Sequence, residues 1–381
     1  MVHGHAPLQQ SAMSLPLSSV RDMSNKRRAR NGKGSADWTL EGAIRSALAG
    51  GHPLSLLSMA SVVINVAKPD RCDTNFVDRT LDGLVGVRTR EVTALLAVVA
   101  ELLVDDPAAQ DRCRREVAER GEHLPQWIAA LPRVDLYRAV RRTHVLGDVD
   151  ELVVGMRLDG GHELTIVVGI DHNMWSSVDD AGAVPEPIDE VLSRVAESSS
   201  DTDVFEMTLA DARVWIEDAL NKPSLGPETE TWPLYRALVR WLVDRLPEGG
   251  EHWSPAGASV SNEELCDRFF ATTSAAPFTD SGHRALLLEL FDTGSGDPLR
   301  WSAARVERAI GGMSYSDDSI PVEVGLDAPD LLRAFIPYAH AQSGIRDELT
   351  SRTLAMVDAL RSSYKREVLR QHKYWYLDDA V

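Results

Sequence analysis

The chain has 381 residues, of which 44% are hydrophobic and 26% are charged, and its formal net charge is −18. This composition excludes a fibrous or wholly disordered protein, because it supplies enough apolar material for one or two packed cores. A strongly acidic body repels nucleic-acid backbones and anionic lipids, which disfavours a general binder of either.

Residues 1–36 are predicted to be a disordered basic tail, because they lack hydrophobic periodicity. Five of the residues in this tail are candidates for contact with nucleic acid or the ribosome: Lys26, Arg27, Arg28, Arg30 and Lys33. A solvated terminus without a partner is the alternative. Met23 is a second candidate start codon, and residues 1–22 would then not be translated.

Residues 37–134 are predicted to form a helical domain. The uncharged stretch "SALAGGHPLSLLSMASVVINVA" is interrupted by Gly50, His52 and Pro53, so it predicts two buried helices rather than a membrane span. "RTREVTALLAVVAELLVDD" has an aliphatic face flanked by charges, which is typical of an amphipathic helix.

Residues 135–222 are predicted to form a small α+β unit. Two apolar runs with period-2 features flank Asp159-Gly160-Gly161, which predicts a hairpin over residues 151–171. "EPIDEVLSRVAESS" predicts a helix, "DTDVFEMTL" a further strand, and "ADARVWIEDALNK" another helix.

Residues 226–372 are predicted to form a C-terminal helical domain. Within it, "GDPLRWS" predicts a helix start, with Asp297 as N-cap, Pro298 in the first turn and Trp301 packed inward. An anion site made by Gly294, Gly296 and Arg300 is the alternative. The fold class is therefore α+β and predominantly α-helical, with helical bundle segments flanking a small antiparallel sheet built on one hairpin.

The motifs "IDHN", "GDPLRWS" and "APDLLRAFIPYAHAQSGI" are similar to those of a family of actinobacterial proteins that has no assigned activity. The likeness extends from about residue 37 to residue 365. It implies an actinobacterial, intracellular origin and no particular chemistry. The three widely spaced cysteines, Cys72, Cys113 and Cys266, agree with buried thiols in a reducing cytoplasm.

The stretch "VVGIDHNMWSSVDDAG" carries the strongest chemical candidates, because polar side chains gather where a predicted strand ends. Asp171 and His172 are candidate catalytic residues. A metal site is a further hypothesis, with candidate ligands Asp171, His172, Asp179 and Asp180. The alternative is a turn in which Asp171 and Asn173 bond to backbone.

No Ser-His-Asp or Cys-His arrangement is predicted, because the chain has no GxSxG elbow and no local cysteine motif. No motif indicates a cofactor. These observations favour a cytoplasmic, non-enzymatic interaction or regulatory protein with protein partners, and with nucleic acid reached only through the tail. The alternative is a metal-dependent hydrolase or other enzyme that uses Asp171 and His172.

Overall fold

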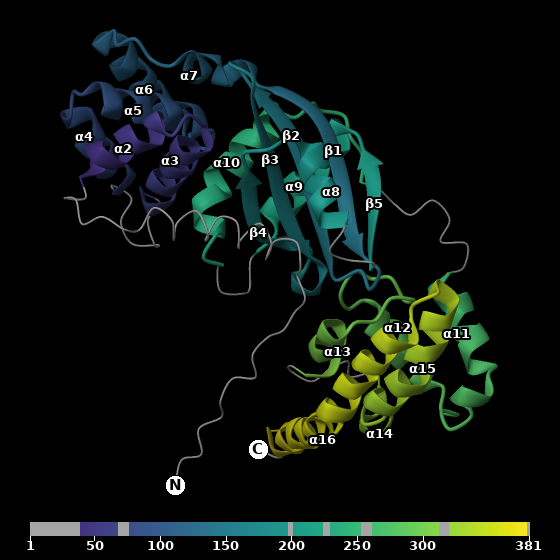
Figure 1. The fold of residues 1–381 in the computed structure, drawn as a ribbon. Coiled ribbons are helices and arrows are strands. Elements are labelled where there is room, and N and C mark those ends of the chain that lie inside the picture. Colours follow the sequence, from purple (N-terminus) through teal and green to yellow (C-terminus); the bar gives the residue numbers. More distant parts are fainter. Residues whose placement is uncertain are drawn as a thin grey trace.

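The computed structural model describes residues 39–67, 76–196, 201–223, 229–252, 261–311 and 320–378. It confirms a predominantly helical α+β protein with one small antiparallel sheet. Figure 1 shows an N-terminal group of helices, a central sheet with its covering helices, and a C-terminal group of helices. Within the described ranges, no helix combines the length and the apolar character needed to cross a membrane.

The N-terminal helices pack around α5, whose residues from Val92 to Leu102 are almost all buried. Thr89 caps α5 by accepting a hydrogen bond from the backbone N–H of Val92. The helices of this group are α2 (Leu40–Ala49), α3 (Leu54–Ala67), α4 (Phe76–Gly86), α5 (Arg90–Leu102), α6 (Pro107–Arg120) and α7 (Gln126–Ala130), followed by a 3₁₀ turn, η1 (Leu131–Arg133). The break between α2 and α3 confirms the two predicted helices on either side of Gly50–Pro53.

The sheet is antiparallel, with strand order β4-β3-β2-β1-β5. Its strands are β1 (Asp135–His144), β2 (Val149–Leu158), β3 (His162–Asp171), β4 (Ser177–Val184) and β5 (Thr202–Met207). The predicted hairpin is β2–β3, in which Leu158 pairs with His162 across the glycine turn. The sheet is larger than one hairpin, because β1 and β4 extend the same meander and β5 returns beside β1.

Both faces of the sheet are covered, so the strands carry apolar side chains on both sides. On one face, Val140, Val153 and Val167 pack against α8 (Ile188–Ala196). On the other face, residues such as Leu152 and Ile166 join α9 (Leu209–Asn221), α10 (Trp232–Arg245) and the N-terminal helices in one apolar core.

The position of α10 differs from the predicted division of the chain, which placed it in the C-terminal helical domain that begins at residue 226. In the structure α10 packs beside α3, and Ser61 accepts a hydrogen bond from the backbone N–H of Ala237 (Figure 1). The first apolar core therefore extends to Leu246, and a second core begins at Leu265.

The second core belongs to the C-terminal helical unit, which we define as residues 261–311 and 320–378. Its elements are α11 (Asn262–Phe270), η3 (Thr273–Ala275), α12 (Gly282–Phe291), α13 (Ala303–Ile310), α14 (Val322–Gly325), α15 (Ala328–Ser343) and α16 (Asp347–Asp378). Trp301 and Phe335 are fully buried at its centre, with ring centroids 6.4 Å apart. The inward packing predicted for Trp301 is confirmed.

Candidate functional site

The end of β3 leads into a 3₁₀ turn, η2 (His172–Met174), and two residues, Trp175 and Ser176, connect this turn to β4. Asp171 caps this turn, because its carboxylate accepts the backbone N–H of Asn173 at 2.8 Å. Trp175 and Ser176 follow with φ values of 61° and 55°. Two consecutive non-glycine residues in the left-handed region are uncommon, and such strain is concentrated at functional sites.

His172 lies between a carboxylate and a hydroxyl. Its Nε2 is 3.0 Å from Oδ2 of Asp150, and its Nδ1 is 2.9 Å from Oγ of Ser176. A neutral ring that donates from Nε2 to Asp150 has its Nδ1 lone pair free to accept the hydroxyl proton of Ser176. The segment from η2 to Ser176 and the start of β2 therefore form a hydrogen-bonded Ser-His-Asp arrangement, which we call the Ser176–His172–Asp150 relay.

Asp150 is fully buried, with 0% of its surface exposed. The Nε of Arg141 lies 2.9 Å from the same Oδ2 atom that faces His172. Burial raises the pKa of Asp150, but the hydrogen bond from His172 and the charges of His172 and Arg141 outweigh it and hold the pKa below its usual value. Asp150 is therefore an anion at neutral pH, able to orient the ring and to stabilise it when protonated.

Aromatic rings border the relay. The guanidinium of Arg141 lies 4.8 Å from the centroid of the Trp215 ring. The same ring meets His172 edge to face at 6.5 Å, and it lies 5.5 Å from His252. Trp175, directly before the serine, is 54% exposed, so the relay has one large apolar side chain in contact with solvent.

The four predicted metal ligands do not come together. Asp179 is exposed on a bulge of β4, whereas Asp180 is buried and accepts hydrogen bonds from the hydroxyls of Thr229 and Thr231 at 2.7 and 2.6 Å. Across the part of the chain that the structure describes, no three His, Cys, Asp or Glu side chains are close enough to hold a metal ion. Asp171 forms the turn contact that was the alternative to a ligand role.

The carboxyl group of Asp171 nevertheless has a raised pKa. Burial, with smaller contributions from the negative charges of Asp179 and Asp148, raises its pKa from 3.8 to about 6. The backbone N–H of Asn173 and the charge of His172 oppose this rise. Asp171 therefore becomes charged only near neutral pH.

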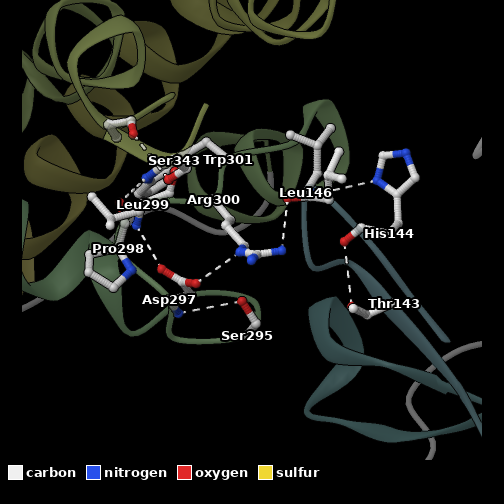
Figure 2. A network of polar contacts seen from close by, with 12 residues as sticks. Thr143, His144, Leu146, Ser295, Asp297, Pro298, Leu299, Arg300, Trp301 and Ser343 are labelled. Atoms are coloured by element: carbon white, nitrogen blue, oxygen red, sulfur yellow. Dashed lines mark hydrogen bonds and ion pairs between the residues drawn. The ribbon is translucent and has the colours of Figure 1, made fainter. Parts of the chain in front are cut away.

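The C-terminal helical unit meets this site at the turn between β1 and β2. Arg300 donates from Nη1 to the carbonyl of Val145 at 3.1 Å and pairs with Asp297 at 3.2 Å, so its guanidinium lies between the loop and the turn (Figure 2). Gly147 lies in this turn with φ of 71°, a left-handed conformation that favours glycine, and a Cβ there would be in ordinary contact with Arg300 Cδ at 3.4 Å.

The predicted helix start at Asp297 is wrong. Helix α13 begins at Ala303, and its N-cap is Ser302, whose hydroxyl accepts the backbone N–H of Arg305. Asp297 instead accepts the backbone N–H of Leu299 within the preceding loop.

Arg305 was missed by sequence reasoning. It is almost fully buried, stacks 4.1 Å from the Trp301 ring, and donates to the carbonyls of Phe291, Asp297 and Arg300. Burial lowers its pKa to about 10, which still leaves it charged at neutral pH.

Asp150 and Ser176 were also missed, although the hairpin register contains a signal for the aspartates. Leu158 pairs with His162 and Val149 with Asp171. Counting back from the glycine turn therefore places Asp148 and Asp150 beside the end of β3, next to His172. Ser176 has no comparable signal, because only the conformation of Trp175 and Ser176 turns its hydroxyl toward the ring.

The two cysteines within the described residues, Cys113 and Cys266, are buried and unpaired, as the sequence predicted. Burial raises the pKa of both thiols to about 11, so neither is a thiolate at neutral pH. Cys72 and the predicted basic tail, with Lys26, Arg27, Arg28, Arg30 and Lys33, lie outside the described residues.

No protein-family model matches the chain, and no solved structure matches it. A mitochondrial bifunctional dethiobiotin synthetase/7,8-diamino-pelargonic acid aminotransferase from Oryza sativa subsp. japonica is 27% identical over 238 residues. This similarity covers 55% of the present chain and 28% of the rice enzyme, so the chain spans little more than a quarter of that relative's length.

Proposed function

We propose that the chain is an enzyme of acyl transfer, a hydrolase or acyl transferase, with Ser176 as nucleophile and His172 as general base. The observation that supports the proposal is the position of the His172 ring, 2.9 Å from the Ser176 hydroxyl and 3.0 Å from the buried Asp150 carboxylate. A serine is a weak nucleophile unless a base removes its proton, and a base works best when a third group fixes its tautomer.

In this reaction Oγ of Ser176 forms a bond to the carbonyl carbon of an ester or amide, and its proton moves to Nδ1 of His172. The tetrahedral intermediate then breaks its bond to the leaving group, which takes the proton from His172. Water, or another hydroxyl or amine acceptor, attacks the acyl-serine in the same way and restores the serine. Asp150 keeps Nε2 of His172 protonated throughout and stabilises the charged ring.

A fluorophosphonate probe tests this proposal directly. Attack of Ser176 on the phosphorus expels fluoride and leaves a stable adduct, which intact-protein and peptide mass spectrometry locate. We expect labelling at Ser176, and its loss in Ser176→Ala. In His172→Asn we expect a fall in rate of about 100-fold or more, since general-base catalysis contributes that much.

The neighbouring serine provides a matched control. Ser177 is buried, and its hydroxyl donates to the carbonyl of Met174 at 2.9 Å rather than to a histidine. Ser177→Ala should therefore keep the labelling of Ser176. Labelling elsewhere on the chain, or an equal rate in His172→Asn, would refute the proposed role of the relay.

A non-enzymatic interaction or regulatory role is a second proposal, favoured by one surface. Val204 of the edge strand β5 is 51% exposed, and apolar side chains on sheet edges are common sites of strand pairing with partners. Val204→Asp should reduce recovery of a specific partner in affinity purification, whereas Ser193→Asp on the exposed face of α8 should not. Equal recovery of the same partner by both variants would contradict a role for β5.

A further inference from the structure

The turn that carries His172 is connected to the C-terminal helical unit by hydrogen bonds. The contact runs through Asp148, which lies in the turn between β1 and β2. The backbone carbonyl of Asp148 accepts the N–H of His172 at 2.8 Å. Its carboxylate oxygen Oδ1 accepts Nδ2 of Asn173, also at 2.8 Å. Both contacts are made to η2, so Asp148 anchors the turn that carries the ring.

The same carboxylate oxygen of Asp148 accepts a hydrogen bond from the hydroxyl of Ser302 at 2.5 Å. Ser302 is 2% exposed, and as the N-cap of α13 it also accepts the N–H of Arg305 at 2.9 Å. One hydroxyl therefore joins the first turn of a helix in the second core to the turn that carries the candidate base.

The loop before α13 reinforces this contact by its shape. Gly294 has φ of 64°, and a Cβ at this position would lie 2.9 Å from Oδ1 of Asn173. The backbone of the C-terminal unit thus packs directly against the side chain of Asn173, and glycine suits both this close approach and the positive φ. Arg300, bonded to the carbonyl of Val145, fixes the other side of the β1–β2 turn (Figure 2).

We infer that Ser302 is a positioning residue for His172, acting across the boundary between the two cores through Asp148 and Asn173. Ser302 touches neither Ser176 nor the ring, so its effect is geometric. The inference rests on the proposed function, because it supplies the support that the Ser176–His172–Asp150 relay requires. It also gives the C-terminal helical unit a role in holding the candidate base.

The test compares two serine N-caps of the same unit. Ser302→Ala removes both the cap of α13 and the bond to Asp148. Ser261→Ala removes only the cap of α11, where the hydroxyl accepts the N–H of Glu264 at 3.1 Å. Both variants should lower the melting temperature, because each loses a helix cap. Only Ser302→Ala should slow fluorophosphonate labelling of Ser176, by about 10-fold or more, since small displacements of a base have effects of this size.

Ser302→Thr keeps a hydroxyl that can cap α13 and donate to Asp148, so it should restore the labelling rate. Equal labelling rates in Ser302→Ala and Ser261→Ala would overturn the inference while leaving the proposed function intact. If the wild-type protein is not labelled at all, the proposed function fails instead. In that case the ¹⁵N NMR signals of the His172 ring decide: a shift in Ser302→Ala that is absent in Ser261→Ala supports the positioning contact, and unchanged signals overturn it.

Discussion

Asp171→Asn should stabilise the protein at neutral pH, although it changes a residue at the centre of the candidate site. The carboxylate of Asp171 is buried beside other acidic groups, and its pKa is raised from 3.8 to about 6. Ionising it therefore opposes folding. The difference between these two values corresponds to about 3 kcal/mol at pH 7, since one pKa unit is worth 1.36 kcal/mol.

The pH dependence has a definite sign. A carboxyl with a raised pKa binds its proton more tightly in the folded protein than in the unfolded chain. Its contribution to stability is therefore fully present below about pH 4 and is lost as the pH rises through about 6. The side-chain amide introduced by Asp171→Asn would keep an oxygen that accepts the N–H of Asn173 and would carry no charge, so this loss should disappear.

Urea unfolding followed by circular dichroism at several pH values between 4 and 8 measures both effects. The gap between the variant and the wild type should open between pH 4 and 6 and approach 3 kcal/mol above pH 7. Asp106→Asn is the control, because Asp106 also accepts a backbone N–H, that of Ala109, as the N-cap of α6. A gap that is absent, constant with pH, or of opposite sign would refute the account of Asp171.

Substitutions at Arg305 and at two glycines test the packing. Arg305→Met should cost about 3–5 kcal/mol in urea unfolding, because the buried backbone carbonyls that accept from the guanidinium lose their donor; Arg305→Lys should not restore it, since one ammonium cannot reach them all. A loss below 1 kcal/mol would show that the loop does not depend on Arg305. Gly155→Ala should cost about 1–3 kcal/mol, because the new Cβ would lie 2.8 Å from Cζ of Tyr137. Gly83→Ala, in α4 with no atom within 4 Å of the new Cβ, should instead gain about 0.5–1 kcal/mol in the same assay, and equal effects at the two glycines would contradict both accounts.

The elements that local sequence could predict are those whose partners lie nearby in the chain. The β2–β3 hairpin follows from its glycine turn and the apolar runs on either side. No strand was predicted for the segment of β4, in which Asp179 and Asp180 interrupt the apolar pattern. Asp180 is nonetheless buried, because hydroxyls of Thr229 and Thr231, about 50 residues further along the chain, satisfy its carboxylate.

The candidate site shows the same limit. His172 stood out because a histidine at a strand end is unusual in a run of apolar residues, and the structure places a buried carboxylate 3.0 Å from it. Asp150 did not stand out, since in the sequence it is one of several acidic residues near a turn. The hydrogen bond from Ser302 to Asp148, 154 residues earlier in the chain, depends on how two separate cores dock. No spacing rule expresses that arrangement.

The pairing of α3 with α10 has a consequence during synthesis. The apolar side of α3, with Leu56, Leu57 and Ala60, is completed by a helix in which Ala237 follows Ser61 by 176 residues. At typical translation rates this separation amounts to roughly 10 to 35 s. During that interval the apolar side of α3 in the nascent chain stays exposed to solvent at the ribosome. The first third of the chain, expressed alone, should therefore aggregate or bind a holding chaperone. It should become soluble only when α10 is present in the same chain or is added in trans.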